Sequence, residues 1–114
     1  MPLLQIQTNQ SLDDNQQASL LKKSSAEVAR LLGKPEQYVM VNIQHNPAML
    51  FGGSNEPLAY LELKSIGLPE SKTTELSAAL ADLLSEELGL SANRIYIEFA
   101  DAPRSMWGWN GGTF

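Results

Sequence analysis

The amino terminus carries the first residue that could do chemistry. Pro2 follows Met1 directly, and a strand-like run at residues 3–6 comes straight after it. Removal of Met1 would leave Pro2 with a free secondary amine, a base that the backbone holds in place and whose pKa responds to burial. A second reading is also open, because proline is common at the first residue of an edge strand. Pro2 is therefore a candidate general base whose role depends on the rest of the chain.

Few other side chains offer chemistry. The 114 residues contain no cysteine, which excludes disulfides, thiolate metal sites and thiol redox reactions. The single histidine, His45, is followed by Asn46 and Pro47, a pattern typical of a surface turn. We therefore expect no metal and no cofactor. Eight Lys and Arg against thirteen Asp and Glu give a net charge of -5 without a basic run, so we do not expect nucleic acid as a partner.

The composition is that of an ordinary globular protein, with 43% hydrophobic and 18% charged residues. A chain of this length fits one domain, residues 1–114. No apolar stretch approaches the roughly 20 residues of a membrane span, and no basic region with an apolar core opens the chain. We therefore expect a cytoplasmic protein without a signal peptide or membrane contact, unless it is released by a non-conventional route.

Two helices and four strands are expected. Residues 12–32, with Ser11 as candidate N-cap, have apolar residues at helical spacing and end at Gly33. A second helix with the same spacing passes through Leu76 and ends at Gly89. Strands, two of them marked by alternating apolar and polar residues, are expected at residues 2–7, 39–44, 58–64 and 95–99.

The two halves of the chain, roughly residues 1–56 and 57–114, form an internal repeat. Gly33 and Val39 fall opposite Gly89 and Ile95 at an offset of 56 residues. In the leading strands, residues 2–7 and 58–64, the same offset pairs Leu4 with Tyr60, which places opposite faces of the two strands together. We therefore do not extend the repeat to these strands. Two strand–helix–strand units with right-handed crossovers predict an α/β (α+β) fold, in which a four-stranded mixed sheet carries two helices on one face.

The other face of this sheet, here called the open face, is predicted to lack a covering helix. It would present Met40, Asn42, Tyr96 and Glu98, a mixture that favours self-association. After Asp101 the chain becomes irregular and rich in aromatic and glycine residues. This tail is expected to form a turn or short ribbon that docks elsewhere.

Five separated patches resemble the macrophage migration inhibitory factor family over the whole chain. They occur in the family's order and at close to its spacing. The patches are Pro2; Gly33, Lys34 and Pro35; Phe51, Gly52, Gly53 and Ser54 with Glu56 and Pro57; Ser65, Ile66 and Gly67; and Gly108, Trp109 and Asn110 with Thr113 and Phe114. The resemblance implies a tautomerase-superfamily fold, a homotrimer and an amino-terminal proline as catalytic base.

The resemblance also implies the members of the site. Pro2 matches the base and Lys34 the cation that holds a substrate carboxylate, while the backbone amide of Ile66 helps to position it. Tyr96 and Glu98 would come from the neighbouring subunit. Lys34 also fits a simpler role, because a lysine after a helix-ending glycine complements the helix dipole. The family's apolar pocket rim falls at Trp107, Trp109 and Phe114.

Three positions depart from the family pattern. Glu98 stands where animal relatives commonly have asparagine, and a carboxylate there opposes Lys34 and disfavours acidic substrates. Trp107 stands where a smaller aliphatic residue is usual, which would narrow the pocket mouth. Residues 58–61 lack the paired cysteines behind the thiol redox activity attributed to some relatives, so that activity is excluded.

Three functions remain open from the sequence. The first is a keto–enol tautomerase of phenylpyruvate-like or related enolisable aromatic compounds, acting through Pro2 after loss of Met1. The second is a cytokine-like signalling or binding protein with a vestigial pocket, for which the sequence names no receptor. The third is another superfamily chemistry such as decarboxylation or dehalogenation, which usually sets arginines beside the proline. Neither Arg30 nor Arg104 occupies a recognisable family arginine position, so we rank this last.

Overall fold

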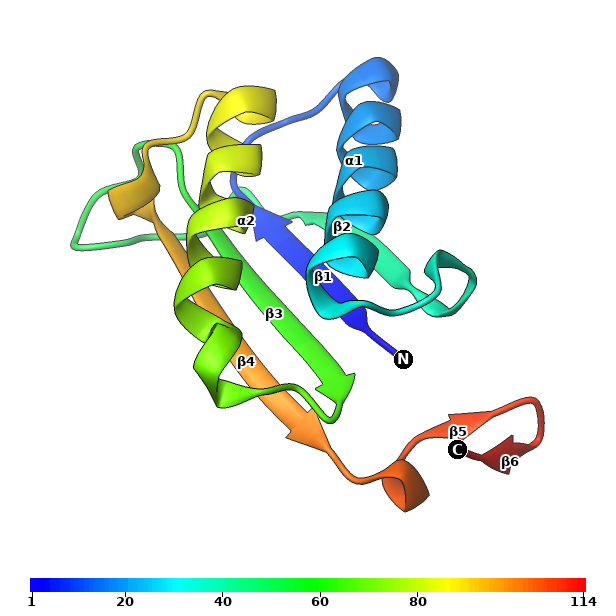
Figure 1. Ribbon diagram of the computed structural model, residues 1–114. Coiled ribbons are helices and arrows are strands. Elements are labelled where there is room, and N and C mark those ends of the chain that lie inside the picture. Colours follow the sequence, from blue (N-terminus) through cyan, green and yellow to red (C-terminus); the bar gives the residue numbers. More distant parts are fainter.

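Two successive βαβ units make up the computed structural model, which describes all residues 1–114 (Figure 1). The first unit contains β1 (Leu3–Thr8), α1 (Asp14–Leu32) and β2 (Met40–His45), and the second contains β3 (Ala59–Ile66), α2 (Thr73–Leu88) and β4 (Ile95–Ala102). The predicted α+β fold is therefore confirmed.

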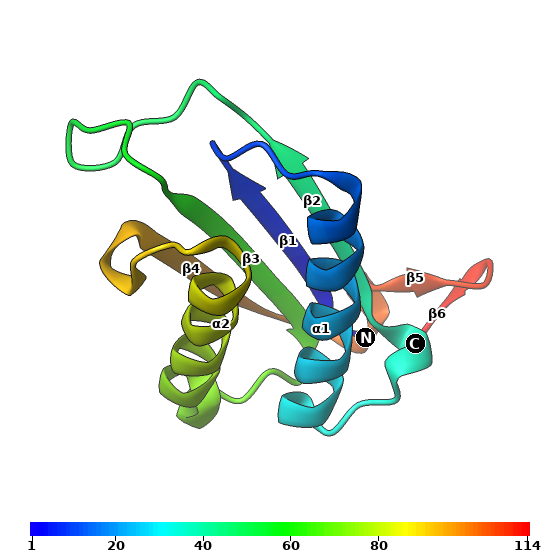
Figure 2. The same ribbon diagram turned by 90° about the horizontal axis from the view of Figure 1, so that it is seen from above.

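The four strands form one mixed sheet in the order β2-β1-β3-β4. Within each unit the two strands are parallel, and the central pair β1 and β3 is antiparallel. Both helices lie on the same face of this sheet (Figure 2). The opposite face has no covering element, as the alternation of residues in β2 and β4 predicted.

Helix α1 begins two residues later than the sequence suggested. Asp13, not Ser11, is the N-cap: its side chain accepts a hydrogen bond from the Gln16 backbone at 2.8 Å, and the Gln16 side chain accepts one from the Asp13 backbone at 3.1 Å. This reciprocal capping box needs a Gln or Glu three residues after the cap, which Ser11 does not have. At the other end, Gly33 takes a left-handed conformation with φ of 62° and ends the helix as predicted.

The internal repeat does extend to the leading strands, contrary to the expectation from the sequence. Leu4 pairs with Val41 and Leu61 pairs with Ile97, so Leu4 and Leu61 occupy equivalent positions. Their offset is one residue larger than that of Val41 and Ile97, because the second unit has one residue fewer between its two strands. At the fixed offset of 56 residues, a residue on the inward face of β1 is therefore aligned with one on the outward face of β3. With an offset of 57 residues the inward faces of the two strands correspond.

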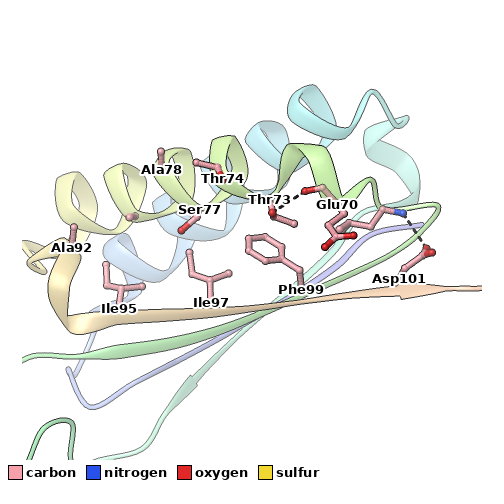
Figure 3. Close-up of a pocket in the computed structure, with 12 residues that line it drawn as sticks. Glu70, Thr73, Thr74, Ser77, Ala78, Ala92, Ile95, Ile97, Phe99 and Asp101 are labelled. Atoms are coloured by element: carbon pink, nitrogen blue, oxygen red, sulfur yellow. Dashed lines mark hydrogen bonds between the residues drawn. The ribbon is translucent and has the colours of Figure 1, made fainter.

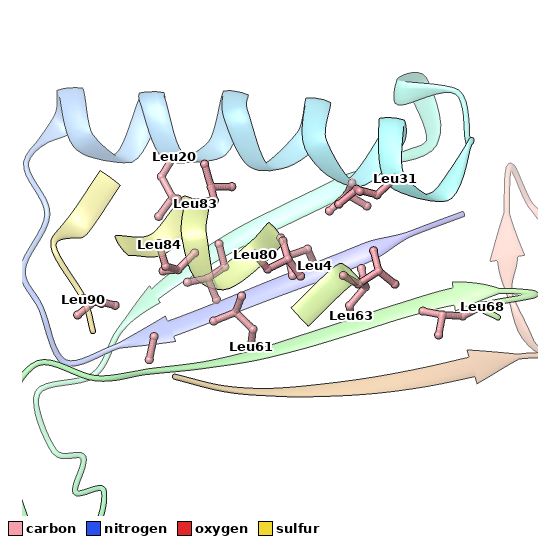
Figure 4. Close-up of a cluster of buried hydrophobic side chains, with 14 residues drawn as sticks. Leu4, Leu20, Leu31, Leu61, Leu63, Leu68, Leu80, Leu83, Leu84 and Leu90 are labelled. Carbon is pink, nitrogen blue, oxygen red and sulfur yellow. The ribbon is translucent and has the colours of Figure 1, made fainter. Parts of the chain in front are cut away.

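The core lies between the helices and the sheet (Figure 4). Strand residues such as Leu4 and Leu61 meet helix residues such as Leu20, Leu80 and Leu84, and all five side chains are fully buried. Each contributes about 1.5–3 kcal/mol relative to an exposed position. This shared core holds β1 and β2 in place, and Pro2 immediately precedes β1.

The tail after β4 is a short ribbon, as predicted. A 3₁₀ turn at Arg104–Met106 leads into β5 (Gly108–Trp109), which pairs with β6 (Gly112–Thr113). The ribbon lies on the side of the molecule where the chain starts, and the two chain ends are close together in both views (Figures 1 and 2). No helix of the chain has the length and apolar character needed to cross a membrane.

Candidate active site

Pro2 lies at the edge of the core, immediately before β1. Its ring is less than 2% exposed, and its carbonyl oxygen accepts a hydrogen bond of 3.0 Å from the Met40 backbone N–H. This bond continues the β1–β2 ladder by one residue and fixes the position of Pro2. The Pro2 nitrogen is joined to Met1 in a peptide bond here, so this form of the chain has its free amine on Met1.

A hollow of about 370 Å³, here called the N-terminal hollow, opens beside Pro2. The start of the chain, the residues before β2 and the ribbon together line it: Met1, Pro2, Leu3, Gln37, Tyr38, Val39, Met40, Trp107, Gly108, Trp109 and Phe114. The structure therefore brings Pro2 together with all three aromatic residues predicted for the pocket rim, Trp107, Trp109 and Phe114.

Aromatic contacts hold the wall of the hollow. The rings of Trp109 and Phe114 are stacked, with centroids 5.3 Å apart and planes 15° from parallel. Tyr38 meets both edge-on, with centroids at 5.4 Å from Trp109 and 5.9 Å from Phe114. Such pairs contribute about 0.5–1.5 kcal/mol beyond burial. Tyr38 was not among the site residues predicted from the sequence. Its position shortly before β2, the strand that starts beside Pro2, was the signal that could have identified it.

Partial burial and two positive charges act on the amine at the chain start. Burial lowers the pKa of the Met1 amine below its ordinary value, and the positive charges of Lys34 and Arg104 lower it further. Lys34 is placed by the end of α1, where its backbone N–H donates to the Ala29 carbonyl at 3.0 Å. The predicted cation, Lys34, is thus one of two positive charges that act on this amine, and Arg104 is the second, which the sequence patterns did not indicate.

Ile66 lies at the same end of the sheet as Pro2. It is the last residue of β3, and Leu3 of β1 is opposite Lys64 in the antiparallel ladder. Strand β3 therefore runs on past the start of β1 by two residues, Ser65 and Ile66. The Ile66 side chain is 9% exposed and takes part in the apolar interior.

Tyr96 and Glu98 do not meet Pro2 within one chain. They lie on β4, opposite Tyr60 and Glu62 of β3, so β3 separates them from β1. The Tyr96 side chain is 65% exposed on the open face. Their expected arrival from a neighbouring subunit stays a prediction.

The Glu98 carboxylate is held by a neighbour on the open face. The Tyr60 hydroxyl donates to it at 2.6 Å and also lies 3.0 Å from the Glu62 carboxylate. Glu62 itself accepts a hydrogen bond from the Gln5 amide at 3.3 Å and forms an ion pair with the Lys64 ammonium at 3.9 Å. These contacts, with Glu98 the largest cause, raise the pKa of Tyr60 well above its usual range. Glu98 is therefore a positioned hydrogen-bond acceptor.

A larger groove, of about 870 Å³, runs between α2 and β4 (Figure 3). Its floor is the inward face of the edge strand, with Ile95, Ile97 and Phe99, and its rim is polar, with Thr73 and Asp101. None of the predicted site residues lies in it. No group of three or more His, Cys, Asp or Glu side chains is arranged to hold a metal ion. Of the predicted site residues, Pro2, Trp107, Trp109 and Phe114 line the N-terminal hollow, and none lines the larger groove.

Comparison with known proteins decides the family. The family model described as "Macrophage migration inhibitory factor (MIF)" matches residues 1–114. The chain belongs to the macrophage migration inhibitory factor family. Among curated MIF relatives, a homolog from Brugia malayi is 45% identical, covering 100% of this chain and 99% of the relative. The MIF of Xenopus laevis is 36% identical over the same shares of the two chains.

Solved structures of MIF homologues share the fold. The chain superposes on a MIF homologue from Prochlorococcus marinus with a TM-score of 0.93 at 45% identity, covering 98% of each chain. It matches the MIF of Trichinella spiralis with a TM-score of 0.89 at 37% identity, covering 98% of this chain and 99% of that one. The MIF-like assignment of the sheet and helices therefore agrees with independent structures.

Proposed function

We propose that this MIF family member, after removal of Met1, is a keto–enol tautomerase of phenylpyruvate-like or related enolisable aromatic compounds, with Pro2 as general base. The observation that carries the proposal is the position of Pro2. It is fixed by the hydrogen bond from Met40, it is buried, and it borders an aromatic hollow beside two cations. The family resemblance at Pro2, Lys34 and Ile66 supports the same assignment.

The surroundings of the amine favour a base that is neutral near pH 7. Once Met1 is gone, the Pro2 amine inherits the apolar wall and the nearby Lys34 and Arg104. Desolvation and neighbouring positive charge lower the pKa of the Met1 amine, and we expect the same surroundings to disfavour protonation of the Pro2 amine. A base whose pKa lies near the working pH accepts and returns a proton most effectively.

The reaction needs one proton to move. Pro2 takes a proton from the carbon next to the ketone, the C–H electron pair becomes the C=C bond, the C=O π pair moves onto the oxygen, and the protonated Pro2 returns the same proton to that oxygen to give the enol. The reverse sequence returns the ketone. Lys34 binds the substrate carboxylate, and the rings of Trp107, Trp109 and Phe114 pack on the aromatic part of the substrate. General acid–base catalysis of this kind contributes roughly 10²- to 10⁴-fold in rate.

We further propose that the chain works as a homotrimer in which Tyr96 and Glu98 complete the site of the next subunit. Large apolar side chains on the open face and at the ribbon support this, since Met40 is 65%, Tyr96 65% and Trp109 51% exposed. Light scattering should give three times the 12.5 kDa chain mass. A second test dissociates the Pro2→Gly and Tyr96→Ala proteins, mixes their subunits and lets them reassemble. If each site takes Pro2 from one subunit and Tyr96 from the next, some mixed trimers contain a site with both residues intact and regain activity.

The test of the proposed base is Pro2→Gly, with phenylpyruvate as substrate and the absence of Met1 verified by mass. The matched control is Pro47→Gly, which makes the same change in an exposed turn. We expect the rate of Pro2→Gly to fall at least about 10²-fold while the control keeps its activity. Equal activity in the wild type and Pro2→Gly would reject Pro2 as the base and favour a signalling or binding role.

A further inference from the structure

Trp107 differs from the other aromatic residues that line the N-terminal hollow. The chain has four close aromatic pairs, and three of them join Tyr38, Trp109 and Phe114 to one another. The fourth involves the loop between β2 and β3, so the Trp107 ring takes part in none of them. Trp107 is half-buried and lines the hollow without belonging to the group of packed rings.

The backbone of Trp107, and not its side chain, supports the ribbon. Its N–H donates to the Arg104 carbonyl oxygen, and its own carbonyl oxygen accepts from the Phe114 N–H, both at 3.2 Å. Neither bond depends on which side chain stands at position 107. A smaller side chain there should therefore leave the ribbon in place and enlarge the hollow.

The other walls of the hollow are held by their own contacts. Pro2 is less than 2% exposed and accepts a hydrogen bond of 3.0 Å from the Met40 backbone. Trp109 and Phe114 are stacked with centroids 5.3 Å apart, and Tyr38 meets both edge-on. Packed groups of this kind resist displacement, so a ligand that is too large cannot easily push these walls apart.

The small volume of the hollow makes the free indole important. About 370 Å³ is near the lower end of the roughly 300–1,000 Å³ found for ligand pockets. In a hollow of this size, the Trp107 indole takes up space that a second fused ring of a ligand would need. A mismatch in size within a hydrophobic pocket changes affinity by roughly 10- to 200-fold.

We propose that Trp107 sets the upper size of the aromatic group that this site accepts, so that the site selects one-ring α-keto acids over those with two fused rings. The selection works by exclusion, because the indole denies space to the larger ligand and does not need to attract the smaller one. The inference rests on the proposed function for its α-keto acid class.

The test measures binding of two inert carboxylates, phenylacetate and naphthylacetate, by calorimetry. The protein has lost Met1, as verified by mass, because Met1 also lines the hollow. We expect wild type to prefer phenylacetate. Trp107→Val should bind naphthylacetate at least about tenfold more tightly than wild type does, without a matching gain for phenylacetate.

Trp109→Val is the matched control, since it makes the same change two residues further along the ribbon. It removes a ring that Tyr38 and Phe114 contact, so both ligands should bind more weakly and their ratio should stay the same. Circular dichroism checks that each variant is folded. Trp107→Phe, which keeps a ring, should give a smaller gain for naphthylacetate and replaces Trp107→Val if that variant does not fold.

Three results would overturn the proposal. If Trp107→Val weakens both ligands alike, the indole only supplies contact area. If its affinity for naphthylacetate equals that of wild type, the indole does not limit the size of the ligand. If neither protein binds either carboxylate, the hollow does not select ligands at all.

Turnover separates this inference from the proposed activity. For an active enzyme, Trp107→Val should raise kcat/KM for indolepyruvate relative to phenylpyruvate at least about tenfold. If wild type is inert with both keto acids but the binding ratio shifts as expected, size selection by Trp107 stands and the tautomerase proposal fails. If wild type is active and the binding ratio does not shift, the tautomerase proposal stands and the role of Trp107 is rejected.

Discussion

Arg94 offers a quantitative test of how the loop between β2 and β3 is held. Its guanidinium donates four hydrogen bonds to main-chain carbonyl oxygens of the loop: 2.7 Å to Phe51, 3.0 Å to Ser54, 3.0 Å to Glu56 and 3.4 Å to Pro57. It also lies over the Phe51 ring at 5.0 Å. A single side chain at the start of β4 thus holds a loop from another part of the sequence.

The loop is built for this contact. Phe51 and Ser54 exchange two backbone hydrogen bonds, at 3.0 and 3.1 Å, around Gly52 and Gly53. Both glycines have positive φ, 60° and 74°, which a tight two-residue hairpin turn requires and side chains disfavour. The turn directs the Phe51 ring onto Tyr96, with centroids 4.4 Å apart. Loss of Arg94 should therefore reach a predicted site residue.

For Arg94→Ala we expect the free energy of unfolding to fall by about 2–4 kcal/mol. Each hydrogen bond contributes about 0.5–1 kcal/mol at this half-exposed position, and four are lost together. Urea unfolding followed by circular dichroism measures the loss, and limited proteolysis of the loop detects local opening. Because the acceptors are neutral carbonyls, the loss should change little with salt.

Two further variants sharpen this test. Arg94→Lys keeps the charge but has three donors on one nitrogen, so it should lose about half as much stability. Lys22→Ala removes an exposed positive charge without a contact and should change stability by less than about 0.5 kcal/mol. If Arg94→Ala loses no more than Lys22→Ala and its loop resists protease as wild type does, the four bonds do not hold the loop.

Three other predictions concern the core, the open face and the amine. Leu84→Ala should lower the free energy of unfolding by about 2–5 kcal/mol, because it leaves a cavity in the core. Leu50→Ala, at a side chain that is 72% exposed, should lower it by less than about 0.5 kcal/mol. Similar losses for the two variants in urea titrations would refute the core assignment. Glu98→Gln should lower the pKa of Tyr60, because the carboxylate stabilises the neutral phenol, and an ultraviolet titration identical to wild type would contradict that contact. Lys34→Gln should raise the pKa of the terminal amine and move the acidic limb of the pH–rate profile to higher pH, whereas a shift to lower pH would argue against Lys34 as its neighbour.

Local patterns were sufficient to predict the elements of the fold. Helical spacing ended by Gly33 and Gly89 located both helix ends, and the alternation through Val41 and Ile97 gave the faces of β2 and β4 correctly. The start of α1 was misplaced because two residues with N-cap propensity, Ser11 and Asp13, stand close together. Only the partner three residues later distinguishes them.

The site was less accessible from sequence, because it depends on contacts between distant segments. Pro2 was a candidate base from its position after Met1, and Lys34 and Trp109 were identified through the family resemblance. Pro2 and Trp109 line one hollow in the structure, and Lys34 acts on the amine at the chain start. Tyr38 was missed, since it contacts Trp109 and Phe114 of a ribbon whose docking position no local pattern encodes. Tyr96 and Glu98 lie on β4, which β3 separates from β1, so their predicted contact with Pro2 requires a second subunit.

The most direct test of the central claim compares one chain in two forms, with and without Met1. Protein made with methionine aminopeptidase inhibited retains Met1, and its Pro2 nitrogen is an amide with no basic lone pair. Intact-mass spectrometry defines each preparation, and phenylpyruvate tautomerisation measures the base. We predict turnover well above the buffer rate for the trimmed form and none for the retained form. Equal turnover by a preparation that fully retains Met1 would contradict the account, because its Pro2 has no amine to act as the base.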